Sequence, residues 1–129
     1  MPEKAKTRIL VADDDSDILD LVRFILIHAG YEVIGVADGS SAIASLEADP
    51  PNLAILDVMM PGLSGLEVLR RVRKNDAIKD MAIILLTVQA GVSDVAAGFA
   101  AGANEYVTKP VVLNELLQIV KSFLTGDRK

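Results

Sequence analysis

Five short apolar runs without helical periodicity are the feature that most constrains how this 129-residue chain can fold. They lie at residues 9–12, 33–36, 53–56, 82–86 and, more weakly, 106–107. A run that is apolar at consecutive positions indicates a strand buried on both faces of a sheet. Strands of that kind belong to parallel sheets, because the crossover connections of a parallel sheet cover both faces with helices.

Helical patterns occupy the gaps between these runs. In the first gap, apolar residues recur at three- and four-residue spacing, and we expect Ser16 to cap this helix and Gly30 to end it. The third helix begins with Ser64 and Glu67 at the spacing of a capping box. The second helix, from about residue 39 to 48, and the fourth, from about 93 to 101, are rich in alanine and glycine and less regular. The last helix has an apolar face made of Leu113, Leu116, Leu117, Val120 and Leu124.

The alternation of strands and helices predicts an α/β fold, doubly wound around a parallel sheet by right-handed crossovers. With 129 residues and 51% hydrophobic content, the chain can bury a core without cross-links. We therefore expect a single domain at residues 1–129, with short polar tails at about 1–7 and 125–129.

Composition disfavours several classes of function. The chain has no cysteine, so it has no disulfide, thiolate metal site or cysteine nucleophile, and its only histidine, His28, is expected to be a surface residue and not a phosphocarrier. Acidic residues outnumber basic ones by 18 to 13, which disfavours direct nucleic-acid binding. The basic run at Arg70, Arg71, Arg73 and Lys74 is interpreted as the solvated face of a helix. No apolar run approaches the roughly 20 residues that span a bilayer, so we expect a cytoplasmic protein without a membrane partner.

Polar residues follow four of the five apolar runs directly. In open parallel sheets, functional groups gather beyond the carboxyl ends of the strands. The sequence therefore predicts that these polar residues meet at one edge of the sheet, with Asp15 either in that group or capping the first helix. The residues are Asp13, Asp14 and Asp15 after the first run, Asp57 after the third, Thr87 after the fourth, and Thr108 and Lys109 after the fifth.

A cluster of this composition calls for a cation. Asp13, Asp14 and Asp57 cannot all stay ionised at close range without one, because each charge raises the pKa of its neighbours. Mg²⁺, or Mn²⁺ in its place, prefers oxygen ligands and commonly works with phosphate. Lys109 can pair with Asp57 and later with a phosphoryl oxygen, and Thr87 can donate its hydroxyl to another oxygen. The carboxylate of Asp57 can then attack phosphorus and form an aspartyl phosphate.

At this point the chain resembles a response-regulator receiver of two-component signalling, similar to the single-domain chemotaxis regulators. The resemblance extends over almost the whole chain and is carried by four segments in the order and spacing of that family. Residues 9–15 read ILVADDD, residues 56–65 read LDVMMPGLSG, residues 86–87 read LT, and residues 102–110 read GANEYVTKP.

The resemblance implies a flavodoxin-like fold with five βα units and strand order 2-1-3-4-5. It also implies that Asp57 accepts a phosphoryl group from a histidine kinase or a histidine phosphotransfer protein. Mg²⁺ would be held by Asp14, Asp57 and the backbone carbonyl of Met59, with Asp13 acting through water. Thr87 and Lys109 would contact the phosphoryl group.

The resemblance further implies a switch. Tyr106 matches the aromatic position that moves inward when the Thr87 hydroxyl engages phosphate, although a purely structural aromatic remains an alternative. The switch would remodel a protein-binding surface on the fourth helix, fifth strand and fifth helix. The Lys109–Pro110 peptide bond matches one that is usually cis in this family. Such a protein is not an enzyme in the ordinary sense, since it catalyses only its own phosphorylation and dephosphorylation.

Other classes of function fit less well. A haloacid-dehalogenase phosphatase would need a second acid two residues after its nucleophile, and Met59 stands there. A flavodoxin-like cofactor binder would need a phosphate-cradling loop after the first strand, where Asp13, Asp14 and Asp15 would repel phosphate. A receiver cut from a larger transcription factor or hybrid kinase, and a degenerate receiver that serves only as a binding scaffold, both stay open as alternatives.

Several positions depart from the family pattern. Val88 follows Thr87 where a small residue is common, and Val111 follows Pro110 where phenylalanine is frequent. Met59 and Gln89 stand where residues tune the lifetime of the acyl phosphate in this family. Met60 is interpreted as a packing residue.

The fourth helix is nearly uncharged, which predicts an apolar partner surface around Val95, Ala96, Ala97, Phe99, Ala100 and Ala101.

Val88 yields a testable prediction. Its branched side chain is expected to crowd the phosphorylation pocket and to slow either phosphoryl transfer or attack by water. Val88→Ala should therefore raise at least one of these two rates, which can be followed as phosphoprotein formation and decay. If both rates are unchanged, the side chain does not crowd the pocket.

Overall fold

The computed structural model describes residues 7–88 and 92–124. These residues fold around one five-stranded parallel sheet. The strand order is β2-β1-β3-β4-β5, which confirms the predicted order 2-1-3-4-5 and the flavodoxin-like fold class. The strands are β1 (Arg8–Ala12), β2 (Glu32–Val36), β3 (Leu53–Asp57), β4 (Ala82–Thr87) and β5 (Glu105–Thr108). The helices between and after them are α1 (Ser16–His28), α2 (Gly39–Ala48), α3 (Gly65–Lys74), α4 (Val92–Ala100) and α5 (Leu113–Leu124).

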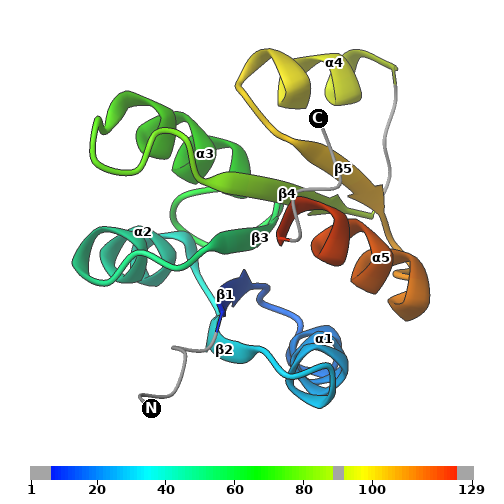
Figure 1. Ribbon diagram of the computed structural model, residues 1–129. Helices are drawn as coiled ribbons and strands as arrows, with labels where there is room; N and C mark the ends of the chain where they lie inside the picture. The colour runs from blue at the N-terminus through cyan, green and yellow to red at the C-terminus, as the bar shows by residue number, and fades with distance from the viewer. Residues whose placement is uncertain (1–6, 89–91, 125–129) are drawn as a thin grey trace.

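Helices cover both faces of the sheet. Figure 1 shows α1 and α5 on one face and α2, α3 and α4 on the other. The consecutive apolar residues of each central strand divide between the two sides. In β1, Leu10 and Ala12 pack toward α2 and α3, whereas Ile9 and Val11 pack toward α1 and α5. This division explains why the central strands are apolar at every position.

The helix starts are confirmed in one case and corrected in another. At α3, Ser64 Oγ accepts the Glu67 amide at 3.2 Å and Glu67 Oε1 accepts the Ser64 amide at 3.0 Å, which is the predicted capping box. At α1 the predicted cap Ser16 is wrong, because Ser16 is already helical. Asp15 caps this helix, since its backbone is extended and its carboxylate accepts the Asp17 amide at 3.0 Å. The helix ends at His28, two residues before Gly30.

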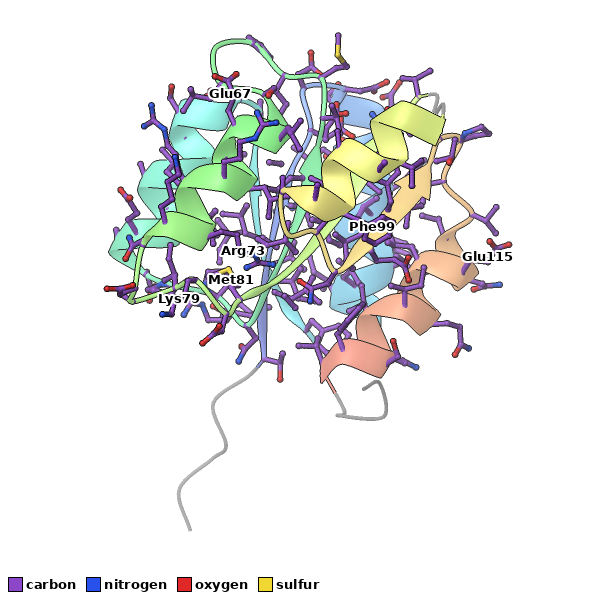
Figure 2. All side chains as sticks on the ribbon, turned by 90° about the horizontal axis from the view of Figure 1, so that it is seen from above. Glu67, Arg73, Lys79, Met81, Phe99 and Glu115 are labelled. Atoms are coloured by element: carbon purple, nitrogen blue, oxygen red, sulfur yellow. The ribbon has the colours of Figure 1, made fainter. Side chains whose placement is uncertain are left out.

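Arg73 corrects a second interpretation. Unlike the exposed Arg70 and Arg71, it turns away from solvent at the end of α3 and lies beside Met81 (Figure 2). Its guanidinium donates to the carbonyl oxygens of Gly102 at 2.7 and 3.0 Å, Met81 at 2.6 Å and Lys79 at 2.9 Å, and to Asn104 Oδ1 at 2.9 Å. Arg73 therefore joins α3 to the segments that precede β4 and β5. A basic run in sequence could not show this, because Gly102 and Asn104 lie 29 and 31 residues away in the chain and the nearer acceptors are backbone carbonyls.

The sequence contains no apolar run long enough to span a bilayer, and the helices of the structure can be compared with that expectation. Within residues 7–88 and 92–124, no helix combines the length and the apolar character that a membrane crossing requires.

We expect Arg73→Met to destabilise the protein by about 2 to 4 kcal/mol, because the partly buried carbonyl groups of Met81 and Gly102 lose their charged donor while the packing of the side-chain stem is kept. Urea denaturation measures this loss. The matched control is Arg70→Met on the exposed face of the same helix, which should change stability by less than about 0.5 kcal/mol. If Arg73→Met lowers the free energy of unfolding no more than Arg70→Met does, the contacts of Arg73 are not needed for stability.

Candidate functional site

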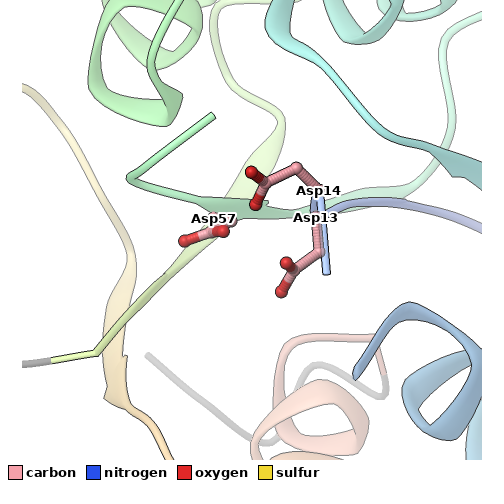
Figure 3. A group of neighbouring side chains, drawn as sticks. All are labelled: Asp13, Asp14 and Asp57. Carbon is pink, nitrogen blue, oxygen red and sulfur yellow. The ribbon is translucent and has the colours of Figure 1, made fainter. Parts of the chain in front are cut away.

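Three carboxylates meet where two neighbouring strands end. Asp13 directly follows β1, Asp57 is the last residue of β3, and the register pairs Ala12 with Leu56. One oxygen of each of Asp13, Asp14 and Asp57 lies within 4.8 Å of the others. Figure 3 shows the three side chains gathered at this edge of the sheet. The predicted convergence of the acidic residues is thus present in the fold.

Lys109 brings a positive charge into direct contact with this group. Its ammonium lies 2.9 Å from Asp13 Oδ2 and 3.3 Å from Asp57 Oδ2, and its side chain is only 8% exposed. The sequence predicted a pair with Asp57, and the structure adds the shorter contact with Asp13. Asp13 is fully buried, and the Lys109 ammonium opposes the charge on its Oδ2. Asp14 is exposed at the surface of the cluster.

The site holds more negative charge than its surroundings neutralise. Burial, followed by repulsion from Asp13, raises the pKa of Asp57 to about 6, against the opposing effects of Lys109 and the Met59 amide. Burial disfavours the charged form of Lys109, but its contacts with Asp13 and Asp57 prevail and raise its pKa. The ammonium therefore stays protonated, while the Asp57 carboxylate is poorly stabilised.

Backbone groups hold the two buried carboxylates in place. The Asp15 amide donates to Asp13 Oδ1 at 2.9 Å, and the Met59 amide donates to Asp57 Oδ1 at 3.2 Å. Asp15 itself caps α1 and is not a member of the carboxylate group, which resolves the two interpretations of this residue.

Gly65 allows α3 to begin directly against the end of β3. A Cβ atom at this position would lie 2.3 Å from the backbone oxygen of Asp57, so a side chain cannot be accommodated without a shift. The sequence identified Gly65 only as part of the capping box and of the family segment. Its contact with Asp57 depends on how closely the helix approaches the strand, which no local pattern reveals.

Thr87 and Lys109 are joined at the same edge of the sheet. Thr87 ends β4, is 6% exposed and pairs in register with Thr108 of β5. The Lys109 amide donates to the carbonyl oxygen of Thr87. The Lys109–Pro110 peptide bond is cis, as the resemblance implied. Both predicted residues therefore lie beside the strand ends that carry the carboxylates.

Tyr106 lies next to a cavity that extends from this edge toward α4. The cavity measures about 340 Å³, and its walls include Met59, Thr87, Val88 and Tyr106. The Tyr106 ring is partly buried against the core, and its centroid is 6.5 Å from that of Phe99. Val88 is 66% exposed, and its predicted effect on rates stays a prediction. Gln89 lies outside the described residues.

The donor set suits a hard divalent cation. Asp13, Asp14 and Asp57 offer carboxylate oxygens within reach of one ion, and such an acidic cluster is typical of the metal site of receivers. The raised pKa of Asp57, which follows from burial and from repulsion by Asp13, indicates negative charge that an ion would stabilise.

Comparisons with known proteins agree with this geometry. The response regulator receiver domain family matches residues 9–121. The response regulator MprA of Mycolicibacterium vanbaalenii is 42% identical over 117 residues, which are 91% of this chain and 50% of that protein. The chain thus spans about half the length of the curated relatives it matches.

Solved structures show the same fold. A CheY-like receiver domain from Methanospirillum hungatei has a TM-score of 0.88 at 34% identity, covering 95% of this chain and 96% of its own. A response regulator from Chloroflexus aurantiacus has a TM-score of 0.88 at 36% identity, covering 94% of this chain and 99% of its own. With the acidic cluster, the Lys109 contact and the strand order in place, these matches show that the chain belongs to the response regulator receiver domain family.

Proposed function

We propose that residues 1–129 form one receiver domain that takes a phosphoryl group onto Asp57 from a histidine kinase or a histidine phosphotransfer protein. Receiver domains are signalling phosphoacceptors and not enzymes in the ordinary sense. The observation that carries the proposal is the position of Asp57, at a strand end, 2% exposed, with the Lys109 ammonium 3.3 Å from its carboxylate. We place this activity in the cytoplasm.

The chain's own residues support the transfer through charge and position. A carboxylate oxygen of Asp57 attacks phosphorus and forms the O–P bond, while the N–P bond to the donor imidazole breaks and the imidazole keeps that electron pair. Lys109 offers an ammonium to a phosphoryl oxygen, and its raised pKa keeps it charged for this role. Thr87, at the end of the adjacent strand, offers its hydroxyl to a second oxygen.

Mg²⁺, or Mn²⁺, would be held by Asp14, Asp57 and the carbonyl of Met59, with Asp13 acting through water. When bound, the ion would neutralise charge on the carboxylates and on the phosphoryl oxygens. Asp13 keeps the ammonium of Lys109 beside Asp57 through its 2.9 Å contact.

The output of this domain is proposed to be protein binding. Thr87 and Tyr106 border one cavity, so a change at the phosphorylated edge can reach β5 and α4 through it. The downstream protein partner would bind the face formed by α4, β5 and α5, where Phe99 is 45% exposed (Figure 2). Regulation of this kind requires two populated states whose balance the phosphoryl group shifts.

We expect acetyl phosphate with Mg²⁺ to add one phosphoryl group to the wild-type protein, and Asp57→Asn to abolish the adduct because its amide is not a nucleophile. Intact-mass spectrometry measures the product, with and without a chelator. Asp15→Asn is the matched control, since an asparagine side chain can also cap α1 and position 15 lies outside the carboxylate group. A folded wild type without any adduct would indicate a degenerate receiver that serves as a binding scaffold.

The charge crowding predicts a pH-dependent effect on stability without a divalent cation. The pKa of Asp57 is about 6 in the folded protein and 3.8 without its environment, so the folded state binds this proton more tightly. The free energy of unfolding should therefore fall as pH rises from about 4 to 6. Asp57→Asn removes this charge and should stabilise the protein by roughly 2 kcal/mol at pH 7.5, and by much less at pH 4.5.

Chemical denaturation in a chelating buffer at both pH values tests this expectation. The matched control is Asp20→Asn at an exposed position of α1, whose effect should not grow with pH. A stability gain for Asp57→Asn that is the same at both pH values would mean that the charge of Asp57 is not the cause.

A further inference from the structure

The ring of Tyr106 occupies the space where a side chain at Gly98 of α4 would begin. A Cβ atom built at Gly98 would lie 2.7 Å from Cε2 and 2.8 Å from Cδ2 of Tyr106, closer than the 3.0 Å that real Cβ atoms essentially never fall below. It would also lie 3.3 Å from Cδ1 of Leu85. The Tyr106 ring in its present position and a side chain at position 98 therefore exclude one another.

Helix α4 itself gives no reason for a glycine at this position. Glycine weakens a helix interior relative to alanine, and the neighbouring helical positions are filled by Ala96, Ala97 and Phe99. Gly98 is buried, whereas Ala96 and Phe99 are exposed, so the glycine stands on the side of α4 that faces the sheet. The space that its missing side chain leaves is bordered by the Tyr106 ring.

The same ring borders the cavity that reaches the phosphorylation edge. Gly98, Tyr106 and Thr87 are all part of its wall, together with Met59. Thr87 ends the strand next to β3, which carries Asp57. A displacement of the ring therefore alters the space beside Thr87.

We propose that Gly98 is a positioning residue that sets where the Tyr106 ring lies, and so sets how readily Thr87 can move toward a group bound at Asp57. The regulatory part of this inference rests on the proposed function, because it assumes that a phosphoryl group engages Thr87. The steric part does not. A methyl group at position 98 narrows the place that the ring occupies, so the ring moves away from α4.

The protein offers a direct reporter for the steric part. It contains no tryptophan and only two tyrosines, Tyr31 and Tyr106, so Tyr31→Phe leaves Tyr106 as the only tyrosine, whose emission is excited selectively at wavelengths that phenylalanine does not absorb. In that background, Gly98→Ala should raise the acrylamide quenching constant of Tyr106 fluorescence, because the ring loses its cover from α4. Ala96→Ser, on the exposed side of α4, is the matched control and should leave the quenching constant unchanged.

Stability measurements separate two effects of Gly98→Ala, namely its clash with the Tyr106 ring and its intrinsic effect on helix stability. With Tyr106 replaced by alanine, Gly98→Ala should stabilise the protein by about fivefold in its unfolding equilibrium constant, as expected for alanine over glycine in a helix. With Tyr106 present, this gain should be lost or reversed. Ala96→Gly measures the same alanine-to-glycine difference on the exposed side of α4, away from the sheet.

The regulatory part is tested by beryllofluoride affinity in the presence of Mg²⁺. Gly98→Ala should weaken binding about tenfold, the factor that corresponds to about 1.4 kcal/mol, because the ring can no longer fill the space that Thr87 vacates. The same substitution in the Tyr106→Ala background should have no effect on affinity.

Each result decides one part of the inference. An unchanged quenching constant together with an equal stability gain in both backgrounds would overturn the steric role of Gly98. Weakened beryllofluoride binding that persists without the Tyr106 ring would overturn the regulatory role. A wild-type protein that binds no beryllofluoride would instead overturn the proposed function, and the fluorescence and stability results would still decide the steric part.

Discussion

The contact of one buried ammonium with two buried carboxylates is the interaction on which the site depends. Lys109 reaches both Asp13 and Asp57, and without it two like charges would be held a few ångströms apart in a region shielded from water. The pair of carboxylates still carries excess negative charge, which raises the pKa of Asp57. In the proposed function, this imbalance favours the binding of a divalent cation, which would offset the negative charge.

The fold tolerates this imbalance because the sheet beneath it is apolar on both faces. Each central strand sends alternate side chains into two separate cores, so the strand ends are held by packing on both sides. Helix α3 begins against the backbone of Asp57, where Gly65 permits the close approach. At its other end, Arg73 connects α3 to the carbonyl groups of Met81 and Gly102. The loops that carry the site are thus anchored at several points.

The cavity between β4, β5 and α4 connects this site to the surface proposed for partner binding. Thr87 borders it near the strand ends, and Tyr106 borders it at the contact with Gly98. Side chains can change position here because unfilled space is available, in contrast to the buried cores on either side of the central strands. The alanine-rich composition of α4 leaves Phe99 as its large exposed side chain among the residues whose surroundings are described.

The sequence by itself determined the strands, their parallel arrangement and the meeting of Asp13, Asp14, Asp57, Thr87 and Lys109, because these follow from apolar periodicity and from which residues end each run. The strand order came from the family resemblance. Only the tertiary structure decided between the two roles of Asp15, and it alone shows that Arg73 donates to the segments before β4 and β5 and that Lys109 lies closer to Asp13 than to Asp57. It alone revealed the contact of Gly98 with Tyr106. The Asp15 cap is a local contact, which the sequence offered as one of two roles. The contacts of Lys109 with the carboxylates and of Arg73 with Gly102 join segments far apart in the chain, and the Gly98 contact joins a helix to the following strand. Local patterns carry no information about the distances between such elements.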